Sequence, residues 1–439
     1  MRILLVSTYE LGRQPFGLAS AAARLRARGH TVQCADLAVE ALPQAGVREA
    51  GVVAFFLPMH TATRLAVRAI ERVRTLNPGA RLGCFGLYAP LNETYLRSLG
   101  VEIVVGGEFE QPLADAIERK ATAPAVSTAH QQFLVPDRTG LAPLAGYAHL
   151  HVNGSVKVVG YTEASRGCKH LCRHCPVVPV YNGHFRIVPP EVVLEDIRRQ
   201  VAAGAGHISF GDPDFFNGPA HALRIVGALA DRHPELTYDV TVKVEHLLKH
   251  RDLVPVLRET GCLFVTTAVE SIEDEVLRRL EKGHTRADFI EVARACRDAG
   301  LALAPTFIPF TPWTTWAGYR ELLRLLAELE LVDQVAPVQL GLRLLVTSGS
   351  RLLELPEIAA AIGEFDQAAL IYPWRHADPS LDELSATVLR LVAREQKSHS
   401  SRREIFAKIW QLATSDPLPE NYELLPRAAI PYLNEPWYC

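Results

Sequence analysis

The sequence alternates short apolar runs with helix-like stretches twice along its length, and this alternation most narrows the folds open to the chain. In the first part, the apolar runs are 2–7, 31–35, 51–57, 81–87 and 102–105, and the helical stretches are 18–28, 61–76 and 92–99. Regular β-α alternation predicts a doubly wound parallel sheet, whose ligands bind beyond the carboxyl ends of its strands.

A second α/β series follows a segment rich in Ala, Pro, Gly and Gln. Its apolar runs are 155–161, 207–210, 238–244, 263–269, 302–307 and 335–345, and its helical stretches are 190–203, 219–231, 273–280, 286–299 and 317–330. Six strands with intervening helices predict a partial or complete parallel (β/α) barrel, with its chemistry on the loops that follow the strands.

These patterns predict an α/β chain with four segments. We expect a Rossmann-like domain over 1–121, a linker over 122–150, a (β/α) barrel over 151–350, and a helical region with an extended tail over 351–439.

Charge and apolar patterning exclude two classes of partner. The chain has 46 Lys and Arg against 49 Asp and Glu, so its net charge of −3 supplies no positive field for nucleic acid. No uncharged apolar run reaches the ~18 residues that a membrane span needs, and residues 1–8 lack the apolar length of a signal peptide. We therefore expect a cytoplasmic protein with no nucleic-acid or membrane partner.

Three of the eight cysteines, Cys168, Cys172 and Cys175, lie directly after the first expected barrel strand. Sulfurs at steps of four and three residues can ligate three irons of a [4Fe-4S] cubane and leave the fourth iron open to bind and reduce a ligand. Zinc is the alternative, because Cys₃His sites are common and His170, His174 and His184 are close by. Structural zinc usually stabilises small modules, whereas this loop opens a large barrel. We therefore favour an iron–sulfur cluster.

This segment resembles the signature of the radical S-adenosylmethionine (SAM) superfamily, CxxxCxxC with an aromatic residue just before the last cysteine. His174 stands at the aromatic position. The resemblance implies a [4Fe-4S] cluster on the three cysteines, with the amino and carboxylate groups of SAM on the open iron. It also implies an external electron donor such as flavodoxin or ferredoxin, because cleaving a C–S bond of SAM to form a carbon radical takes one electron.

Two strand-end segments resemble SAM-binding parts of that superfamily. Gly211, Asp212 and Asp214 resemble the polar segment near the SAM amino group, and the alternative is a strand-to-helix turn. Glu270 and Ser271 resemble the segment that contacts the SAM ribose, and the alternative is a helix cap.

Two basic residues lie in expected barrel strands. Lys243 and Arg343 are candidates to face the SAM carboxylate, and an ordinary ion pair is the alternative for each.

The first domain resembles the cobalamin-binding subclass of the superfamily, through residues 106–110 that close it and 135–138 in the linker. The resemblance covers roughly 1–350 and implies cobalamin as a further cofactor. The usual motif DxHxxG is absent, since 7–12 holds no histidine. His60, at a strand end, is either a substitute for it or a structural histidine.

The last residues, 432–439, resemble the region before the cysteine- or selenocysteine-bearing tail of a radical SAM group associated with arsenic genes. Five prolines predict that 416–439 is an extended arm. We expect the Cys439 thiol to act in catalysis as a soft ligand for trivalent arsenic, with arsenite as the small-molecule substrate. The alternative is a native chain end with one exposed thiol.

The sequence thus predicts a radical SAM transferase that moves a SAM-derived carbon group, with methyl transfer through cobalamin favoured by the domain order. Transfer of the 3-amino-3-carboxypropyl group to trivalent arsenic without cobalamin is the first alternative, and the missing motif and the tail favour it. An iron–sulfur electron carrier or sensor is the second, although a carrier would have four cluster ligands and no use for a SAM pocket.

Overall fold

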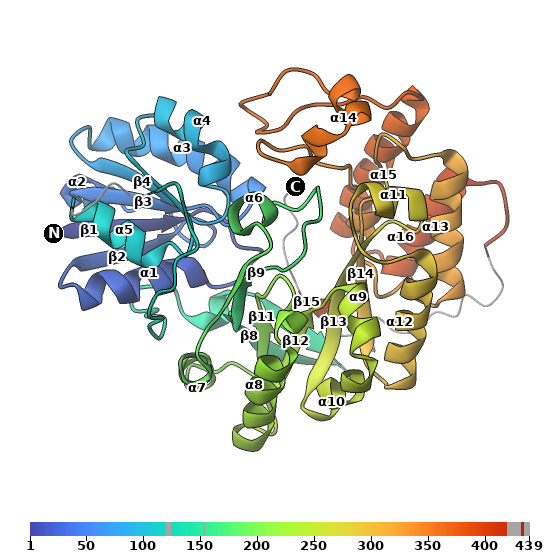
Figure 1. The fold of residues 1–439 in the computed structure, drawn as a ribbon, viewed down its shortest axis with the longest axis horizontal. Helices are drawn as coiled ribbons and strands as arrows, with labels where there is room; N and C mark the ends of the chain where they lie inside the picture. Colours follow the sequence, from blue (N-terminus) through green and yellow to red (C-terminus); the bar gives the residue numbers. More distant parts are fainter. Residues whose placement is uncertain (120–123, 153, 419–431, 434–439) are drawn as a thin grey trace.

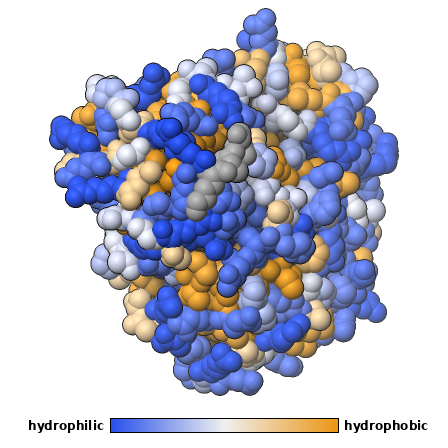
Figure 2. Space-filling view, turned by 60° about the vertical axis from the view of Figure 1, so that its left-hand side comes forward, coloured by the Kyte–Doolittle hydropathy of each residue, from blue (hydrophilic) through white to orange (hydrophobic). Residues whose placement is uncertain are grey.

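The computed structural model describes residues 1–119, 124–152, 154–418 and 432–433. Figure 1 shows two α/β units side by side, with the first sheet at the left, the second at the lower centre and the C-terminal helices at the right. The face in Figure 2 is mostly hydrophilic, and hydrophobic residues gather there in small patches. Within the described ranges, no helix is both long enough and apolar enough to cross a membrane.

The first sheet has six parallel strands in the order β2-β1-β3-β4-β5-β6. The strands are β1 (Arg2–Ser7), β2 (Thr31–Asp36), β3 (Val52–Phe56), β4 (Arg81–Phe85), β5 (Ile103–Gly107) and β6 (Val126–Ser127). This confirms the predicted doubly wound sheet, and it adds β6 from the segment expected to be linker. The strand order reverses between β1 and β3, and such a switch point is where open parallel sheets bind ligands.

Alternating apolar side chains along β1 give the first sheet a core on each face. Ile3 and Leu5 pack with α1 and α5, whereas Leu4 and Val6 pack with α2, α3 and α4. The helices are α1 (Phe16–Ala27), α2 (Gln44–Glu49), α3 (His60–Leu76), η1 (Pro90–Asn92), α4 (Glu93–Ser98) and α5 (Glu110–Ile117). The core beside α3 also contains Cys168, so the cysteine segment packs directly on the first sheet.

The second sheet has seven strands in the order β14-β13-β12-β11-β8-β7-β15. The strands are β7 (His149–Val152), β8 (Ser155–Thr162), β11 (His207–Phe210), β12 (Thr237–Thr241), β13 (Cys262–Glu270), β14 (Ala302–Phe307) and β15 (Tyr432–Leu433). The strands from β8 to β14 are parallel, and β7 and β15 are antiparallel at one edge. The sheet curls into a half barrel (Figure 1), so the predicted barrel is confirmed as a partial one.

Helices and 3-10 turns connect these strands and build the C-terminal region. They are η2 (Leu144–Gly146), α6 (Val178–Tyr181), α7 (Pro190–Ala202), η3 (Phe215–Asn217), α8 (Pro219–Arg232), α9 (Val244–Lys249), η4 (Arg251–Leu253), α10 (Val254–Glu259), α11 (Asp274–Arg279), α12 (Arg286–Asp298), α13 (Trp316–Glu328), η5 (Pro337–Leu340), η6 (Arg351–Glu354), α14 (Pro356–Ala361), α15 (Pro379–Lys397) and α16 (Arg402–Ala413). The largest core joins the barrel strands to these helices.

The prediction of a sixth barrel strand over 335–345 is wrong. Pro337, which has no amide hydrogen for a ladder bond, begins the 3-10 turn η5 instead. The segment keeps one parallel bridge, between Phe310 and Arg343. The third strand is also shorter than expected, because β12 ends at Thr241 and Lys243 lies beyond it.

Part of the predicted tail arm is docked. Strand β15 pairs antiparallel with β7, with Tyr432 opposite His151 and Leu433 opposite Leu150. Cys439 lies outside the described residues.

Candidate functional site

The three cysteines lie in the loop of a β-hairpin formed by β9 (Ser165–Gly167) and β10 (Phe185–Ile187). Strand β9 follows β8 after two residues, so the loop begins at the carboxyl end of the parallel sheet. The chain enters the loop through Gly167, which has a φ of 76° and where a Cβ would lie 2.5 Å from the His184 carbonyl oxygen. Asn217 Nδ2 donates to the Gly167 carbonyl at 3.2 Å and fixes this entry.

The thiols of the loop are largely shielded from water, since Cys168 and Cys172 are buried and Cys175 is partly exposed. Burial, with the neighbouring cysteines adding to it, raises the pKa of Cys168 to about 11 and that of Cys175 to about 12. Such weakly acidic thiols become thiolates beside the positive charge of a bound metal centre. Three cysteines on one loop can supply sulfurs to three corners of an iron–sulfur cubane.

A mixed donor set lies beside the same loop. Among the described residues, Cys168, His170 and Asp214 offer ligand atoms within 4.8 Å of one another. Sulfur, imidazole and carboxylate together suit zinc, so the geometry of the protein alone leaves the zinc alternative open.

Lys243 lies beside the cysteines. Its Nζ is 3.8 Å from Cys172 Sγ and 3.5 Å from Glu245 Oε2, and its side chain is buried at the start of α9. The ammonium therefore faces the place where a cluster and an anionic ligand would lie.

Glu270 ends β13 in a left-handed conformation, with a φ of 68°. Its Oε1 lies 3.1 Å from His174 Nε2 and 3.4 Å from Lys282 Nζ. Burial favours the neutral acid, but Lys282 and His174 outweigh it and lower the pKa of Glu270 to about 2. The carboxylate is thus ionised and tied to the cysteine loop through His174. Lys282 was missed by the sequence reasoning, because a lysine after a short helix gives no signal of burial.

Ser271 has the position of a helix cap. Its Oγ accepts a hydrogen bond from the Glu273 amide at 3.1 Å, just before α11 begins. This contact corresponds to the alternative interpretation of Ser271.

Asp212 is directed at the start of the hairpin. Its carboxylate accepts from the Ala164 amide at 2.9 Å and from Ser165 Oγ at 2.5 Å. Burial raises its pKa to about 7 despite these bonds. Gly211, just before it, packs on Tyr161, whose hydroxyl a Cβ at 211 would overlap.

Asp214 lies between two histidines. Its Oδ2 is 2.6 Å from His246 Nδ1 and 3.7 Å from His170 Nε2, and its Oδ1 accepts from the Phe216 amide. The structure thus brings Asp212 and Asp214 to the cysteine hairpin, where each carboxylate already has protein partners. His246 was missed because it stands on a helix with no motif around it.

Arg343 contacts residues of the C-terminal region, unlike the other candidate site residues. It forms an ion pair with Asp382, donates to the Trp374 carbonyl at 3.0 Å, and stacks 4.0 Å from the centre of the Trp374 ring. These contacts join the end of the half barrel to the C-terminal region.

Cavities lie among the described residues at the carboxyl edge of the first sheet. One of about 900 Å³ is at the switch point, with Thr8, Arg13, Arg64 and Arg68 in its lining. Another of about 240 Å³ lies between the two sheets, with Arg13 again in its wall. His60 makes a structural contact there, since its Nε2 lies 2.7 Å from the Ala369 carbonyl oxygen.

Residues 162–326, which begin at the end of β8 and include the cysteine hairpin, match the family model described as the radical SAM superfamily. The chain contains a radical SAM domain. Similar proteins include a ribosomal protein uS12 methylthiotransferase RimO of Porphyromonas gingivalis, 29% identical over 183 residues, which are 38% of this chain and 41% of that protein. A tRNA-2-methylthio-N(6)-dimethylallyladenosine synthase of Thermus thermophilus is 25% identical over 290 residues, 60% of this chain and 57% of that one. The chain thus spans about two fifths to three fifths of the length of these relatives.

The fold is similar to that of two radical SAM enzymes solved with cobalamin bound. OxsB, solved with aqua-cobalamin bound, has a TM-score of 0.68 at 14% identity, over 88% of this chain and 66% of that one. TsrM from Kitasatospora setae is a methyltransferase solved with cobalamin and a [4Fe-4S] cluster. It has a TM-score of 0.61 at 17% identity, over 75% of this chain and 73% of that one. At these identities the likeness is one of fold.

Proposed function

We propose that this radical SAM enzyme cleaves SAM reductively at a [4Fe-4S] cluster held by Cys168, Cys172 and Cys175, and transfers a methyl group through cobalamin. The observation that carries the proposal is the grouping of three buried or half-buried sulfurs on one hairpin loop at the carboxyl end of a parallel half barrel. When bound, the cluster would supply the electron that breaks a C–S bond of SAM.

The residues around the loop support SAM as the ligand. Lys243 and Lys282 place two buried ammonium groups beside the cysteines, which favours a carboxylate at this position. Glu270, ionised and fixed by Lys282, offers carboxylate oxygens beside the loop for ribose hydroxyls or an amino group. In this proposal Gly211, Asp212, Asp214 and Ser271 shape the wall of the pocket through the contacts described above. Arg343 stabilises the C-terminal region.

The switch-point cavity supports cobalamin. Its volume of about 900 Å³ lies in the upper part of the ~300–1,000 Å³ range of ligand pockets, and Arg64 and Arg68 at its edge suit a phosphate. When bound, cobalamin would carry the methyl group. With His60 committed to Ala369, the residues fit a cofactor held without a histidine beneath it.

A second candidate is transfer of the 3-amino-3-carboxypropyl group to trivalent arsenic. One observation favours it: the cavity that adjoins the hairpin is only about 240 Å³, smaller than the ~300 Å³ of the smallest usual ligand pockets. A corrin ring facing the cysteines would need the two sheets to separate. Cys439 would then serve as a thiol ligand for arsenic in this candidate.

Product analysis separates these candidates. The protein is reconstituted anaerobically with iron and sulfide, reduced with dithionite or with flavodoxin and its reductase, and given SAM with hydroxocobalamin or arsenite. Reductive cleavage at the cluster yields 5′-deoxyadenosine and methionine, and methyl transfer to cobalamin yields S-adenosylhomocysteine. Aminocarboxypropyl transfer yields 5′-methylthioadenosine, and an electron carrier consumes no SAM. Formation of 5′-deoxyadenosine together with S-adenosylhomocysteine that appears only with cobalamin supports the proposal, and SAM left intact under all conditions contradicts it.

A further inference from the structure

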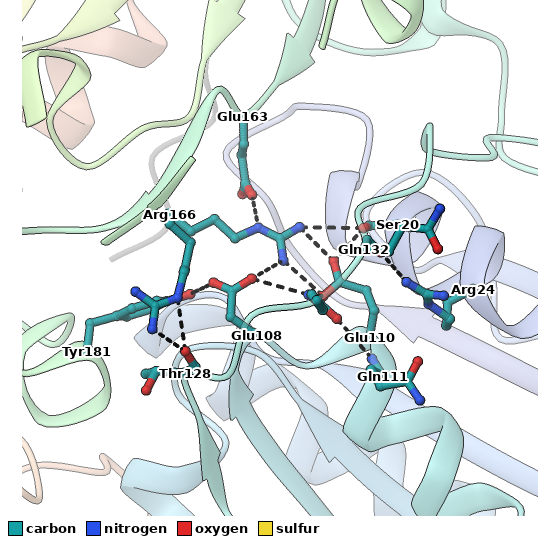
Figure 3. A network of polar contacts seen from close by, with 12 residues as sticks. Ser20, Arg24, Glu108, Glu110, Gln111, Thr128, Gln132, Glu163, Arg166 and Tyr181 are labelled. Atoms are coloured by element: carbon teal, nitrogen blue, oxygen red, sulfur yellow. Dashed lines mark hydrogen bonds and ion pairs between the residues drawn. The ribbon is translucent and has the colours of Figure 1, made fainter. Parts of the chain in front are cut away.

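We propose that Arg166 is a positioning residue through which the first sheet sets the geometry of the cysteine loop, an inference that rests on the proposed function of that loop. Arg166 lies in β9, two residues before Cys168, and is 6% exposed. Figure 3 shows its guanidinium at the centre of a polar network between the two units.

The guanidinium makes a two-pronged contact with the first unit. Its Nη1 donates to Glu110 Oε2 at 2.9 Å, and its Nη2 lies 2.7 Å from Glu110 Oε1. Nη2 also donates to Ser20 Oγ at 3.4 Å, and Nε donates to Glu163 Oε2 at 2.7 Å (Figure 3). Paired bonds of this kind fix orientation as well as distance, so β9 is held at one angle to α1 and α5.

The same network holds the far end of the loop. Glu108 Oε2 lies 3.7 Å from Arg166 Nη1, and Glu108 Oε1 accepts from the Tyr181 hydroxyl at 3.1 Å. Tyr181 ends α6, after the last cysteine, so one carboxylate of the first unit contacts both flanks of the cysteine loop (Figure 3). The turn at Gly107 directs Glu108 there, since φ is 75° and a Cβ would overlap the Ser127 carbonyl oxygen.

Aromatic rings exclude water from the guanidinium. Its Cζ lies 5.8 Å from the centre of the Phe16 ring, 5.2 Å from that of Phe109 and 5.3 Å from that of Phe133. A planar, delocalised guanidinium can stack on these rings and at the same time donate to both carboxylate oxygens of Glu110. The compact ammonium of lysine cannot make both kinds of contact at once.

The charges do not balance inside this enclosure. One guanidinium faces Glu108 and Glu110, which are buried, and Glu163, which is partly exposed. Burial raises the pKa of Glu108 and of Glu163, whereas Arg166 outweighs burial and lowers that of Glu110. Removing the cation therefore leaves the buried carboxyl groups at the base of the loop without their common hydrogen-bond donor and counter-charge, and we expect β9 to shift.

A shift of this kind matters because the first cluster ligand is two residues away. Reactions that need aligned groups lose up to ~100-fold in rate from a misplacement of about 1 Å. Arg166 touches neither sulfur nor SAM in this account, so its effect passes through the position of Cys168.

The first test uses the protein without its cluster. Arg166→Met, Arg166→Lys and wild type are treated with N-ethylmaleimide, and labelling of each cysteine is followed by mass spectrometry. We expect Cys168 to react at least tenfold faster in Arg166→Met, while Cys84 and Cys262, which are buried in the two cores, keep their wild-type rates. Equal acceleration at all three cysteines, or none at Cys168, overturns the proposal.

The second test uses the reconstituted enzyme. Arg166→Lys should retain wild-type iron content, change the electron paramagnetic resonance spectrum recorded with SAM, and lower kcat for SAM cleavage about tenfold with little change in KM. Arg28→Lys is the matched control, because Arg28 bonds Asp115 at 2.7 Å and Glu118 at 3.1 Å between α1 and α5, away from the hairpin. It should behave as wild type.

A wild-type spectrum and kcat in Arg166→Lys overturn the positioning role. Failure of the wild-type protein to bind iron or cleave SAM contradicts the proposed function instead, and the labelling pattern then still decides whether Arg166 positions the loop.

Discussion

The Lys282 ammonium lies 3.4 Å from Glu270 Oε1, and both residues are buried beside the cysteine loop, 3% and 7% exposed. Because both side chains are buried, little water can solvate one of them if the other is removed. His174 Nε2 contacts the same carboxylate oxygen at 3.1 Å.

Removing one member of this pair should be costly. We expect Lys282→Met to lower the free energy of unfolding of the apoprotein by about 3–5 kcal/mol, because it leaves the Glu270 carboxylate buried without its main cation. Urea unfolding measures the loss. Adding Glu270→Gln to Lys282→Met should recover most of it, and a single variant within about 1 kcal/mol of wild type would show that the pair is not coupled.

Asp212 should make stability depend on pH. Burial raises its folded-state pKa to about 7, above the ordinary value of 3.8. The folded state then binds more protons than the unfolded state between these values, so this group's contribution to stability is full below about pH 4 and is lost as the pH rises to about 7. Asp212→Asn should flatten that part of the profile relative to wild type in urea unfolding from pH 4 to 8. Parallel profiles for the two proteins would contradict the assignment.

Gly211 should tolerate no side chain. A Cβ there would overlap the Tyr161 hydroxyl, so we expect Gly211→Ala to lower the free energy of unfolding by about 1–3 kcal/mol. Tyr161→Phe in the same chain should restore part of the loss by removing the hydroxyl.

Gly227→Ala is the control for that substitution. Gly227 lies in α8, where a Cβ would meet open space, so alanine should stabilise the helix by about 0.5–1 kcal/mol. Equal effects of the two substitutions in urea unfolding would show that the overlap at 211 is relieved without cost.

The alternation of apolar runs and helical stretches in the sequence was sufficient to predict most of the fold. Parallel strands and their crossover helices are long, regular patterns, and both sheets follow them. The segment 335–345 was misassigned because its apolar composition suits a strand while Pro337 and Gly341 shape a 3-10 turn.

The site was harder to predict than the fold. The cysteine spacing is local and gives the loop directly, but partners such as Lys282 for Glu270, or Asp382 for Arg343, come from distant parts of the chain. A single sequence shows no sign that a lysine or an arginine is buried and paired, because the same residue types occur on solvated helix faces.

The central claim is that Cys168, Cys172 and Cys175 hold a [4Fe-4S] cluster with one iron open to SAM. The most direct measurement is the electron paramagnetic resonance spectrum of the anaerobically reconstituted, dithionite-reduced protein, recorded before and after SAM is added. The account predicts a [4Fe-4S] signal of about one cluster per chain that changes on addition of SAM and is lost in each single Cys→Ala variant. A protein that carries one zinc and gives no iron–sulfur signal, or a signal that SAM leaves unchanged, would contradict it.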